Sequence, residues 1–597
     1  MAVDAPQMSY AELVREVADD WLAAVESKRQ IEQRRLLDYK LYRRFREDVS
    51  ERGFDEATKG PFGWSKLTVP LIYWIVETIV PRIATKPPTL VVKPLTPQAV
   101  PYAQAKELEL QETLENMGIR SEVHRALKQM VLYGDGPTKL TWDGARRRPR
   151  FTSINWFDWF LSPDAATPET AEVIYHRTWY TPRQLKRLSK MVDRNGNPLF
   201  HGLDQVAQGE MAEAADSLFS ERREASGQGS ASWSPEGGMF CLVEAWYEDG
   251  TVVVMGGSRG DRIVQIRTSP FRDEENQPVR PFVVFSNSDD PNSPYSIGDA
   301  EMLEDHQSEL STLRNQAIDQ TTVNLAAPIV YSGNVSKTAV DAAFGQPGGS
   351  LRVNGDVRAQ VMRMTPGAVS SDFYNFYDNV RGESQYVSGV NDNVAGQATE
   401  GRQTATEISV INEEANKRWQ FKVAKVEDGF GRLGKLVDLA ERRYGPPGRA
   451  IRVPKGMTID DDQRGLMGVG GEALEAGQSP GGFARTSPFT NADGTKYDVS
   501  VKAGSLAIPS ELEEFQKLMA LLQALNINPQ IIEQIDWREI TRMIVQVAGY
   551  DPERILLSDQ VIAQNQMVAA LQQQLALPAA TGGGAASAPP QPAAAAA

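Results

Sequence analysis

Reactive side chains are scarce in this sequence of 597 residues. It holds a single cysteine, Cys241, and four histidines, His124, His176, His201 and His306. One cysteine excludes an intramolecular disulfide framework and fits a reducing compartment. No histidine has a cysteine or a second histidine at the spacing of a zinc site, and a nucleophilic triad has little material. We therefore predict no metal site, no cofactor, no catalytic residues and no enzymatic activity.

Positive charge and long hydrophobic runs are also lacking. The formal net charge is −15, whereas a protein that grips nucleic acid through its phosphates is usually basic. The charge by itself therefore argues against tight DNA binding. The most apolar stretch, Leu67–Ile83, contains Pro70, Glu77, Pro81 and Arg82 and is shorter than the about 20 apolar residues of a membrane span. We expect a buried helix there and no membrane association.

The rest of the composition is typical of a soluble globular chain, with 41% hydrophobic and 24% charged residues, so a substantial core is expected. A prior of about 150 residues per domain indicates about four modules. Residues 10–49 have the pattern of a helical arm, and residues 193–238 are weakly patterned, which indicates a mobile insertion. Helical patterns dominate over shorter strand patterns, and we predict an α+β fold that is mainly helical.

The most informative stretch, Tyr295–Tyr444, predicts a helix, a compact insert, a second helix, a loop and a long third helix. The first helix should span about Ile297 to Ala327, because the following proline disfavours the α conformation in the residue before it. The insert, Ile329–Ala368, has the pattern of short strands around turns, at Ile329–Tyr331 and Leu351–Val353. The second helix is expected at Ser370–Ser388, the loop at Gly389–Gly401 and the third helix at Thr404–Tyr444.

The first of these helices has little apolar surface for its length. Leu303 and Leu310 are seven residues apart with Leu313 nearby, which is a narrow seam like that of a coiled coil. Arg314 is its only arginine, and several acidic residues lie on the other faces, among them Glu301, Glu304 and Asp305. Because so polar a helix is difficult to stabilise alone, we interpret it as packing beside copies of itself with one face toward water.

A glycine pattern in the third helix offers an alternative interpretation. Gly429–Lys435 contains GxGxxG and nearly a phosphate-binding loop, which needs a preceding strand to deliver its glycine turn. No strand precedes it, the apolar spacing continues through Phe430 and Leu433, and Leu436 stands where a Ser or Thr would bind Mg²⁺. We therefore favour close helix packing over nucleotide binding.

The order of these elements resembles the portal proteins of tailed bacteriophages, in which a stem helix, a clip, a second stem helix, a tunnel loop and a long wing helix follow one another. Tyr295–Asp299 and the following residues to Asn315 are similar to the start of the first stem helix in that family. Gly401–Glu407 is similar to the start of its long helix, and Trp156–Asp164 to its wing. The likeness covers most of Lys66 to about Gln560, and its specificity comes from the order of the motifs.

The resemblance implies a portal-type subunit with wing, stem, clip and crown that assembles into a ring. The implied division is an N-terminal helical arm at 1–65, the wing at 66–295, the first stem helix at 296–327, the clip at 328–368, the second stem helix at 369–388, the tunnel loop at 389–403, the long wing helix and wing return at 404–504, and the helical crown at 505–577. Residues 578–597 are rich in proline, alanine and glycine and should be disordered.

In that family, subunits form a closed homo-oligomeric ring, normally of twelve, at one capsid vertex. Double-stranded DNA enters through the central channel during packaging and leaves through it during ejection. The implied location is the virion, at the capsid portal vertex, after assembly in the host bacterial cytoplasm. The implied partners are the terminase large subunit, head-completion and tail adaptor proteins, and the major capsid and scaffolding proteins.

The resemblance also assigns roles to particular residues. The tunnel-loop residues nearest the DNA would be Asn391, Asp392, Asn393, Gln397, Glu400 and Arg402. The clip residues for docking would be Tyr331, Asn334, Lys337, Phe344, Arg352 and Arg358. Acidic stem residues such as Glu301, Glu304 and Asp305, where they face the channel, would repel DNA phosphates and keep the duplex from adhering, which reconciles the acidic charge with a DNA channel.

Two other function classes remain open at this point. A nucleic-acid-processing enzyme, such as a terminase subunit or a nuclease, needs a phosphate loop or a carboxylate metal site, and no convincing one is found. A helical scaffold without a DNA link explains the acidity and the long helices, but it does not explain the ordered insert between two of them.

Overall fold

The computed structural model describes residues 9–44, 65, 67–83, 88–193, 195–206, 217–227, 239–273, 275–325, 329–333, 335–344, 350–356, 361–363, 371–390, 405–445, 450–452, 483–485 and 496–501. All of them belong to the first of two units, residues 1–507. The second unit, residues 508–597, lies outside the described part, and so do the predicted crown and tail.

The chain begins with a long helix, α1 (Tyr10–Arg43), which ends earlier than the predicted residue 49. Ser9 and Glu12 form a capping box: the Ser9 hydroxyl accepts from the Glu12 N–H at 3.3 Å, and the Glu12 carboxylate accepts from the Ser9 N–H at 2.8 Å. The helix ends at Arg44, whose φ of 55° is left-handed. The predicted helical arm is therefore confirmed over residues 10–43.

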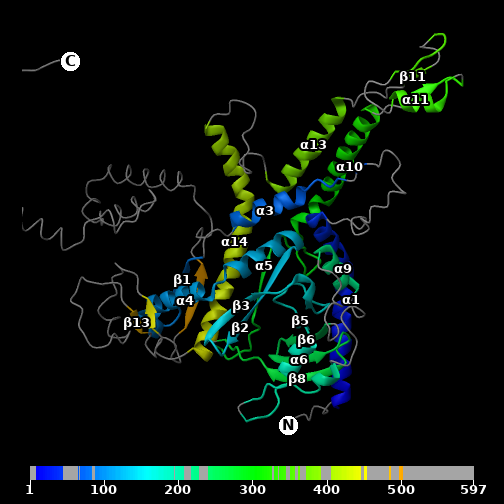
Figure 1. The fold of residues 1–597 in the computed structure, drawn as a ribbon. Coiled ribbons are helices and arrows are strands. Elements are labelled where there is room, and N and C mark those ends of the chain that lie inside the picture. Colours follow the sequence, from blue (N-terminus) through cyan, green and yellow to red (C-terminus); the bar gives the residue numbers. More distant parts are fainter. Residues whose placement is uncertain are drawn as a thin grey trace, which may run out of the picture. The chain divides into compact units, whose positions relative to one another are not determined.

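A five-stranded antiparallel sheet lies beside α1, in the order β4-β5-β6-β7-β8 (Figure 1). Its strands are β4 (Trp159–Leu161), β5 (Val173–Tyr180), β6 (Phe240–Tyr247), β7 (Thr251–Gly256) and β8 (Arg262–Thr268). Because side chains alternate along a strand, Val243 and Ala245 of β6 pack toward Trp21 of α1, whereas Phe240 and Leu242 join a cluster on the opposite face.

That opposite face is covered by the short helices α6 (Pro182–Leu188) and α7 (Leu203–Val206). The helix α9 (Ser217–Ala225) instead contacts α1, and its Phe219 packs against Trp179 of β5. Leu203 and Val206 of α7 are buried against β7 and β8. The described parts of residues 193–238 thus contain two short helices, which the weak sequence pattern did not predict. A few apolar residues in a polar stretch are enough to dock a short helix onto an apolar sheet face.

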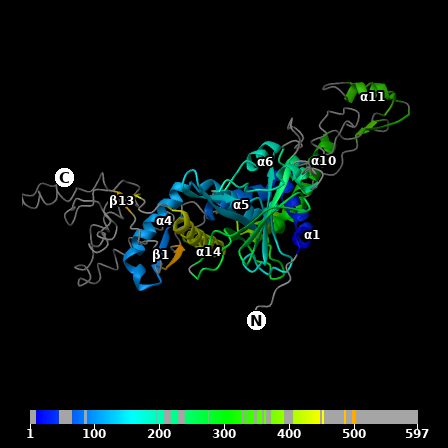
Figure 2. The ribbon, with the colours of Figure 1, turned by 90° about the horizontal axis from the view of Figure 1, so that it is seen from below.

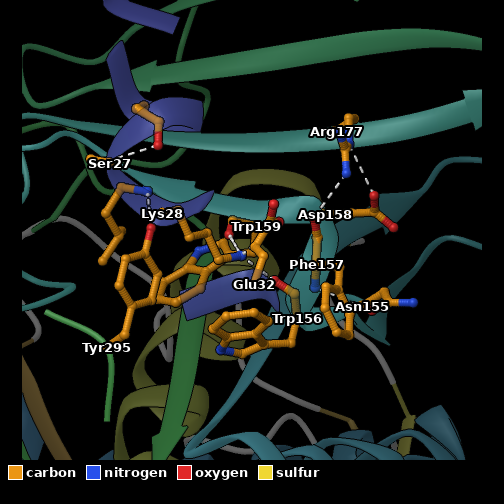
Figure 3. Close-up of polar contacts among 12 residues, drawn as sticks. Ser27, Lys28, Glu32, Asn155, Trp156, Phe157, Asp158, Trp159, Arg177 and Tyr295 are labelled. Atoms are coloured by element: carbon orange, nitrogen blue, oxygen red, sulfur yellow. Dashed lines mark hydrogen bonds and ion pairs between the residues drawn. The ribbon is translucent and has the colours of Figure 1, made fainter. Parts of the chain in front are cut away.

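A buried lysine fastens α1 to the start of this sheet (Figure 3). The Nζ of Lys28 donates to the backbone oxygens of Trp156 at 2.6 Å and Trp159 at 2.7 Å, and it lies 3.7 Å from the ring centroid of Trp156. The Oε1 atom of Glu32, one turn further along α1, lies 3.7 Å from the same Nζ. Burial lowers the pKa of Lys28 to about 7. The carbonyl oxygens and aromatic faces replace the water that this ammonium group loses.

A second, three-stranded sheet has the order β3-β2-β9 and forms the middle of the unit. Its strands are β3 (Arg148–Ser153), β2 (Asp135–Asp143) and β9 (Phe282–Ser286), and α5 (Arg120–Tyr133) and α14 (Ala405–Tyr444) pack against it. The central hydrophobic cluster lies between these elements and α3 (Leu71–Ile83). The predicted buried helix in this apolar stretch is confirmed, because its Ile72, Ile75 and Ile79 are almost fully buried.

The C-terminal part of α14 packs against a two-stranded sheet of β1 (Leu90–Pro94) and β14 (Tyr497–Val501), and α4 (Ala103–Met117) lies beside this sheet (Figure 2). A Cβ at Gly429 would lie 2.7 Å from the Phe285 ring, and one at Gly434 would lie 2.7 Å from Val499. The glycine pattern in α14 therefore allows close approach of the helix to two sheets, and the prediction of helix packing is confirmed.

The remaining elements complete the described chain. They are η1 (Pro97–Tyr102), η2 (Trp156–Asp158), α10 (Asp299–Leu325), β10 (Ile329–Tyr331), α11 (Lys337–Phe344), β11 (Val361–Arg363), α13 (Ser371–Ser388), β12 (Ala450–Arg452) and β13 (Phe483–Arg485). The strands β12 and β13 pair with each other, as do β10 and β11.

A buried ion pair joins the two larger sheets. The ammonium group of Lys139 on β2 is hydrogen-bonded to the carboxylate of Glu244 on β6, and Trp246 Nε1 donates to the same carboxylate at 2.9 Å. Burial alone would raise the pKa of Glu244, but the charge of Lys139 outweighs it and lowers this pKa to about 2. Burial has the opposite effect on the adjacent His176 and, together with the charge of Lys139, lowers its pKa to about 4.

We predict that Glu244→Gln lowers the free energy of unfolding by about 3 kcal/mol at pH 7, because it leaves the buried Lys139 without its partner. The pKa of Glu244 is lower in the folded than in the unfolded chain, so its contribution is complete above pH 4.5 and is lost as the pH falls toward 2. Urea unfolding at several pH values measures the free energy of unfolding of the native protein and of the variant. Glu248→Gln, at an exposed carboxylate next to the same strand, is the control. An equal effect of both variants at pH 7 would contradict the prediction.

Candidate functional site

The helices α10 and α13 lie side by side and are joined by an insert that contains β10, α11 and β11 (Figure 1). Both helices match their predicted spans to within two residues at each end. The first residues of α10 pack against α1, α3 and α5, whereas its last residues lead into the insert. The helix pair therefore has a base in the central core and an end that carries the insert.

On one side, the base is held by two arginines of α1. Arg34 and Arg35 bind the carboxylate of Glu301 at 2.7 and 2.5 Å. The Nη2 of Arg35 also donates to the backbone oxygen of Ser296 at 3.1 Å, and Asp38 accepts from Arg35 at 3.2 Å. Burial raises the pKa of Asp38 to about 7, against the attraction of Arg35. Glu301 is therefore occupied by partners from its own chain.

On the other side, the base is held by two lysines of α14. Lys422 binds both carboxylate oxygens of Asp299, at 2.7 and 2.5 Å. Lys425 binds the carboxylate of Asp289 at 2.8 Å and the backbone oxygen of Asn287 at 3.1 Å. The amide of Asn287 in turn donates to Asp299 at 3.2 Å. The first turn of α10 is thus clamped between α1 and α14, and its acidic residues also suit the positive end of the helix dipole.

The base is also closely packed. Gly134, at the turn between α5 and β2, has a φ of 101°, and a Cβ there would lie 1.9 Å from the backbone oxygen of Ser296. A Cβ at Gly298 would lie 2.4 Å from the backbone oxygen of Leu132. Only glycine allows this contact between the end of α5 and the start of α10.

A row of polar side chains at intervals of four residues follows α10 outward from the base: Gln307, Ser311, Asn315 and Asp319. Their oxygens accept from the backbone N–H groups of Ile72, Val69, Leu67 and Ser65, in that order, at 2.9, 3.0, 2.7 and 2.6 Å. Asn315 also donates to the Leu67 oxygen at 2.9 Å. This polar row supplies hydrogen bonds to the chain that leads into α3.

The leucine seam of α10 packs within its own chain and not, as predicted, against copies of the chain. Leu303 and Leu310 are almost fully buried in the central cluster of their own chain, and Leu313 is packed against it. They therefore cannot form the seam between copies of the chain that the spacing suggested. A repeat of seven marks one buried stripe on a helix, but it does not say whether the stripe faces its own chain or another.

The remaining predicted residues of α10 are more accessible. Asp305 and Arg314 are exposed, and Glu304 is half-buried. Burial and the neighbouring charge of Asp305 raise the pKa of Glu304. Of the three predicted acidic residues, Glu301 is paired within the chain, whereas Glu304 and Asp305 lie on the side of the helix that is accessible to solvent.

The insert differs from its prediction in one strand and one helix. The strand Ile329–Tyr331 is present and pairs with Val361–Arg363, whereas the strand predicted at Leu351–Val353 is not formed. Between them lies the unpredicted helix α11, whose Val340 and Ala343 are buried, as is Val335 just before it. Short amphipathic patterns of about eight residues allow either strand or helix, and here the helix buries two of its apolar side chains.

The predicted docking residues of the insert divide into two groups. Tyr331, Lys337, Phe344 and Arg352 are described, and all four are exposed. Asn334 and Arg358 lie outside the described residues, as do all six predicted residues of the loop after α13.

Titratable side chains form no apparent catalytic or metal-binding arrangement in the described residues. In the part of the chain that the structure describes, no group of three or more His, Cys, Asp and Glu side chains could hold a metal ion. His306 is half-buried on α10, and its Nδ1 faces no hydrogen-bond partner. No described helix is both long enough and apolar enough to cross a bilayer.

The sequence model of the phage SU10 portal protein family matches residues 144–463, which is more than half of the 597-residue chain. The chain belongs to this family. The resemblance to the portal proteins of tailed phages is thereby confirmed. No curated protein matches the chain.

The match shows which parts of this portal protein the family shares. It begins at the turn between β2 and β3 and continues through α10, the insert, α13 and α14 to just beyond β12. It therefore includes the whole helix pair and the two lysines that hold its base, Lys422 and Lys425, whereas Arg34 and Arg35 lie before the matched residues.

Sequence reasoning missed the polar row of this portal protein, which it took for a water-facing surface. The signal was present in the spacing, because Gln, Ser, Asn and Asp at intervals of four residues lie in line on one face of a helix. Side chains of these types are the ones that bind backbone N–H groups. The missing information was the extended partner, which lies about 240 positions earlier in the sequence.

We predict that Asn315→Ala speeds hydrogen exchange at the Leu67 amide on the order of tenfold, because it removes three hydrogen bonds that hold this segment to α10, two with the backbone of Leu67 and one with the hydroxyl of Ser65. Hydrogen exchange of the peptide that contains Leu67 measures this. The control is Gln316→Ala, at the next and exposed position of the same helix. Equal exchange in the two variants would contradict the role of Asn315.

Proposed function

We propose that this chain is the subunit of a portal ring, through whose central channel double-stranded DNA is packaged into a capsid and ejected from it. The proposal is supported first by membership of the portal protein family. It is also supported by the helix pair α10 and α13, which corresponds in order to the stem of such a ring, with the insert as its clip. The single observation that carries it is the family match across this whole assembly of elements.

The proposal gives the acidic outer side of the stem a role. Asp305 and Glu309 are exposed on α10, and Glu304 is half-buried between them and the base. Where such carboxylates face the channel, they repel DNA phosphates and let the duplex slide without adhering. The excess of acidic residues in the chain, 78 against 63 basic ones, is consistent with passage of DNA and not with a tight grip on it.

The clip is proposed as the docking platform for the terminase motor and later for head-completion and tail proteins. Large apolar side chains are exposed on this small element: Val330, Tyr331, Phe344 and Met362. Lys337 and Arg352 lie exposed among them. Exposed aromatic and apolar residues with cations beside them are typical of protein–protein interfaces. We propose a structural role without catalysis, since the terminase supplies the motor.

Ring assembly is tested on the purified full-length protein by native mass spectrometry and negative-stain microscopy. We expect closed rings of about twelve copies with a central hole, because each subunit presents two different faces to its neighbours. A protein that stays monomeric at high concentration, or that assembles into open filaments, would contradict the proposal.

A second test addresses the tunnel loop, which lies outside the described residues. We predict that deletion of residues 391–401 leaves ring assembly intact but impairs DNA packaging or DNA retention, because the loop is proposed to act at the DNA. Ring formation and packaged DNA per particle are measured in parallel. A deletion variant that no longer assembles would instead assign the loop a structural role.

A further inference from the structure

The turn between β2 and β3 carries a concentration of positive charge. Four of the seven residues 144–150 are arginines, namely Arg146, Arg147, Arg148 and Arg150, and none is acidic. The chain as a whole has a formal net charge of −15, so this turn departs sharply from the average of the chain. We call residues 143–150 the arginine hairpin.

The backbone of the arginine hairpin has a defined turn. The Oδ1 atom of Asp143 accepts from the backbone N–H groups of Ala145 and Arg146, each at 3.1 Å. Arg147 adopts a left-handed φ of 51°, and the strands are paired as far as Asp143 and Arg148. The arginine side chains are therefore presented from a preorganised backbone, which lowers the entropy cost of binding a partner.

One of the four arginines has a structural role, and the other three do not. The Nη1 atom of Arg148 donates to the backbone oxygen of Asn116 at 2.7 Å, at the end of α4, where a cation suits the negative end of the helix dipole. Arg146, Arg147 and Arg150 are exposed. The Nε atom of Arg146 lies 4.0 Å from Asp143, and no described residue forms an ion pair with the other two.

The carboxylates around the arginine hairpin do not cancel its charge. Glu122, at the start of α5, accepts from the Ser153 N–H of β3 at 2.9 Å and from Arg125 at 3.3 Å. Glu115 is exposed near the end of α4. Residues 115–125 and 143–150 together contain six arginines and three acidic residues, a net charge of +3. These like charges repel one another, and an anionic partner relieves the repulsion.

The chemistry of this surface favours phosphate groups over a protein partner. Protein–protein interfaces usually have an apolar or aromatic core. In the described residues from 115 to 153, no large hydrophobic side chain is exposed. Guanidinium groups are permanently charged and form paired hydrogen bonds with phosphates. Contact with a phosphate backbone needs this charge and no apolar core.

The arginine hairpin lies far from the base of the stem. Trp142, the residue before it, stacks on Tyr444 at the end of α14, with ring centroids 5.4 Å apart. Lys422, which holds the base of the stem, is 22 residues earlier and therefore about 33 Å away along α14. The positive charge of the hairpin is thus well separated from the acidic side chains of α10.

We propose that the arginine hairpin binds the phosphate backbone of double-stranded DNA, through Arg146, Arg147 and Arg150 and without reading the base sequence. The choice of DNA as the partner rests on the portal function proposed above. The contact lies on the wing and is separate from the channel. Acidic stem residues let the duplex slide, whereas this hairpin holds DNA that lies against the wing.

Binding of a closed DNA circle tests the inference, because a relaxed, covalently closed circle cannot thread the channel of a ring that has already assembled. Binding by the purified full-length protein is measured by filter retention at several NaCl concentrations. When Arg146, Arg147 and Arg150 are all replaced by alanine, we expect an affinity at least about tenfold lower at about 0.1 M NaCl. The slope of log affinity against log salt should fall by at least about 2.7, because each phosphate contact contributes about 0.9.

The matched control replaces Arg15, Arg187 and Arg262 by alanine, which removes the same charge from three exposed positions on α1, α6 and β8. We expect this control to bind the circle like the unsubstituted protein, and both triple variants to keep its far-ultraviolet circular dichroism spectrum. An equal loss of affinity in the two triple variants would reduce the effect to net charge and overturn the inference. Unchanged binding by the hairpin variant would also overturn it.

The assembly state separates this inference from the proposed function. Rings that fail to bind the circle overturn the role of the arginine hairpin and leave the portal function standing. Absence of rings from the unsubstituted protein overturns the portal function, whereas comparison of the two triple variants still decides whether the hairpin binds DNA.

Photo-cross-linking locates the contact, because the native chain has only one cysteine, the buried Cys241. In a Cys241→Ser background, Ala145→Cys at the exposed turn is modified with an aryl azide and irradiated with the DNA circle. We expect at least tenfold more attachment to DNA than from Ala11→Cys, at an exposed alanine near the start of α1. Equal attachment from the two positions would overturn the inference.

Discussion

The structure depends on polar contacts that hold one polar helix at its base. In α10, two leucines are almost fully buried, and much of the remaining attachment comes from hydrogen bonds and ion pairs. A hydrogen bond contributes on the order of 1 kcal/mol, and one to a charged group about twice that. Several such contacts together match the burial of a few large apolar side chains. A helix with a narrow apolar stripe can therefore be fixed firmly within one subunit.

The same contacts connect parts of the chain that are far apart in sequence. The helix α1 is fastened to the five-stranded sheet through Lys28 and to α10 through Arg34 and Arg35. On the other side, Lys422 and Lys425 tie α14 to the start of α10. The contacts of Arg34, Arg35 and Lys422 are made to carboxylates in the first turn of α10, so this turn is tied to both α1 and α14.

Local patterns predicted the long helices, the buried helix at residues 67–83 and the family, because these depend on periodicity and on the order of elements. They predicted the close packing of Gly429 and Gly434 for the same reason. They failed where a long-range partner decides the outcome. The partners of Glu301 lie 266 and 267 positions earlier in the chain, and those of the leucine seam include α3 and α5. The strand expected at residues 351–353 failed because short amphipathic stretches do not determine their own pairing.

The central claim is that α10 is held at its base by its own chain, and a double-mutant cycle on Arg35 and Glu301 tests it most directly. Urea unfolding is measured for the native protein, Arg35→Ala, Glu301→Ala and the double variant. The account predicts a coupling free energy of about 2 kcal/mol, with the double variant little less stable than either single one. Effects that add to within about 0.5 kcal/mol would contradict it.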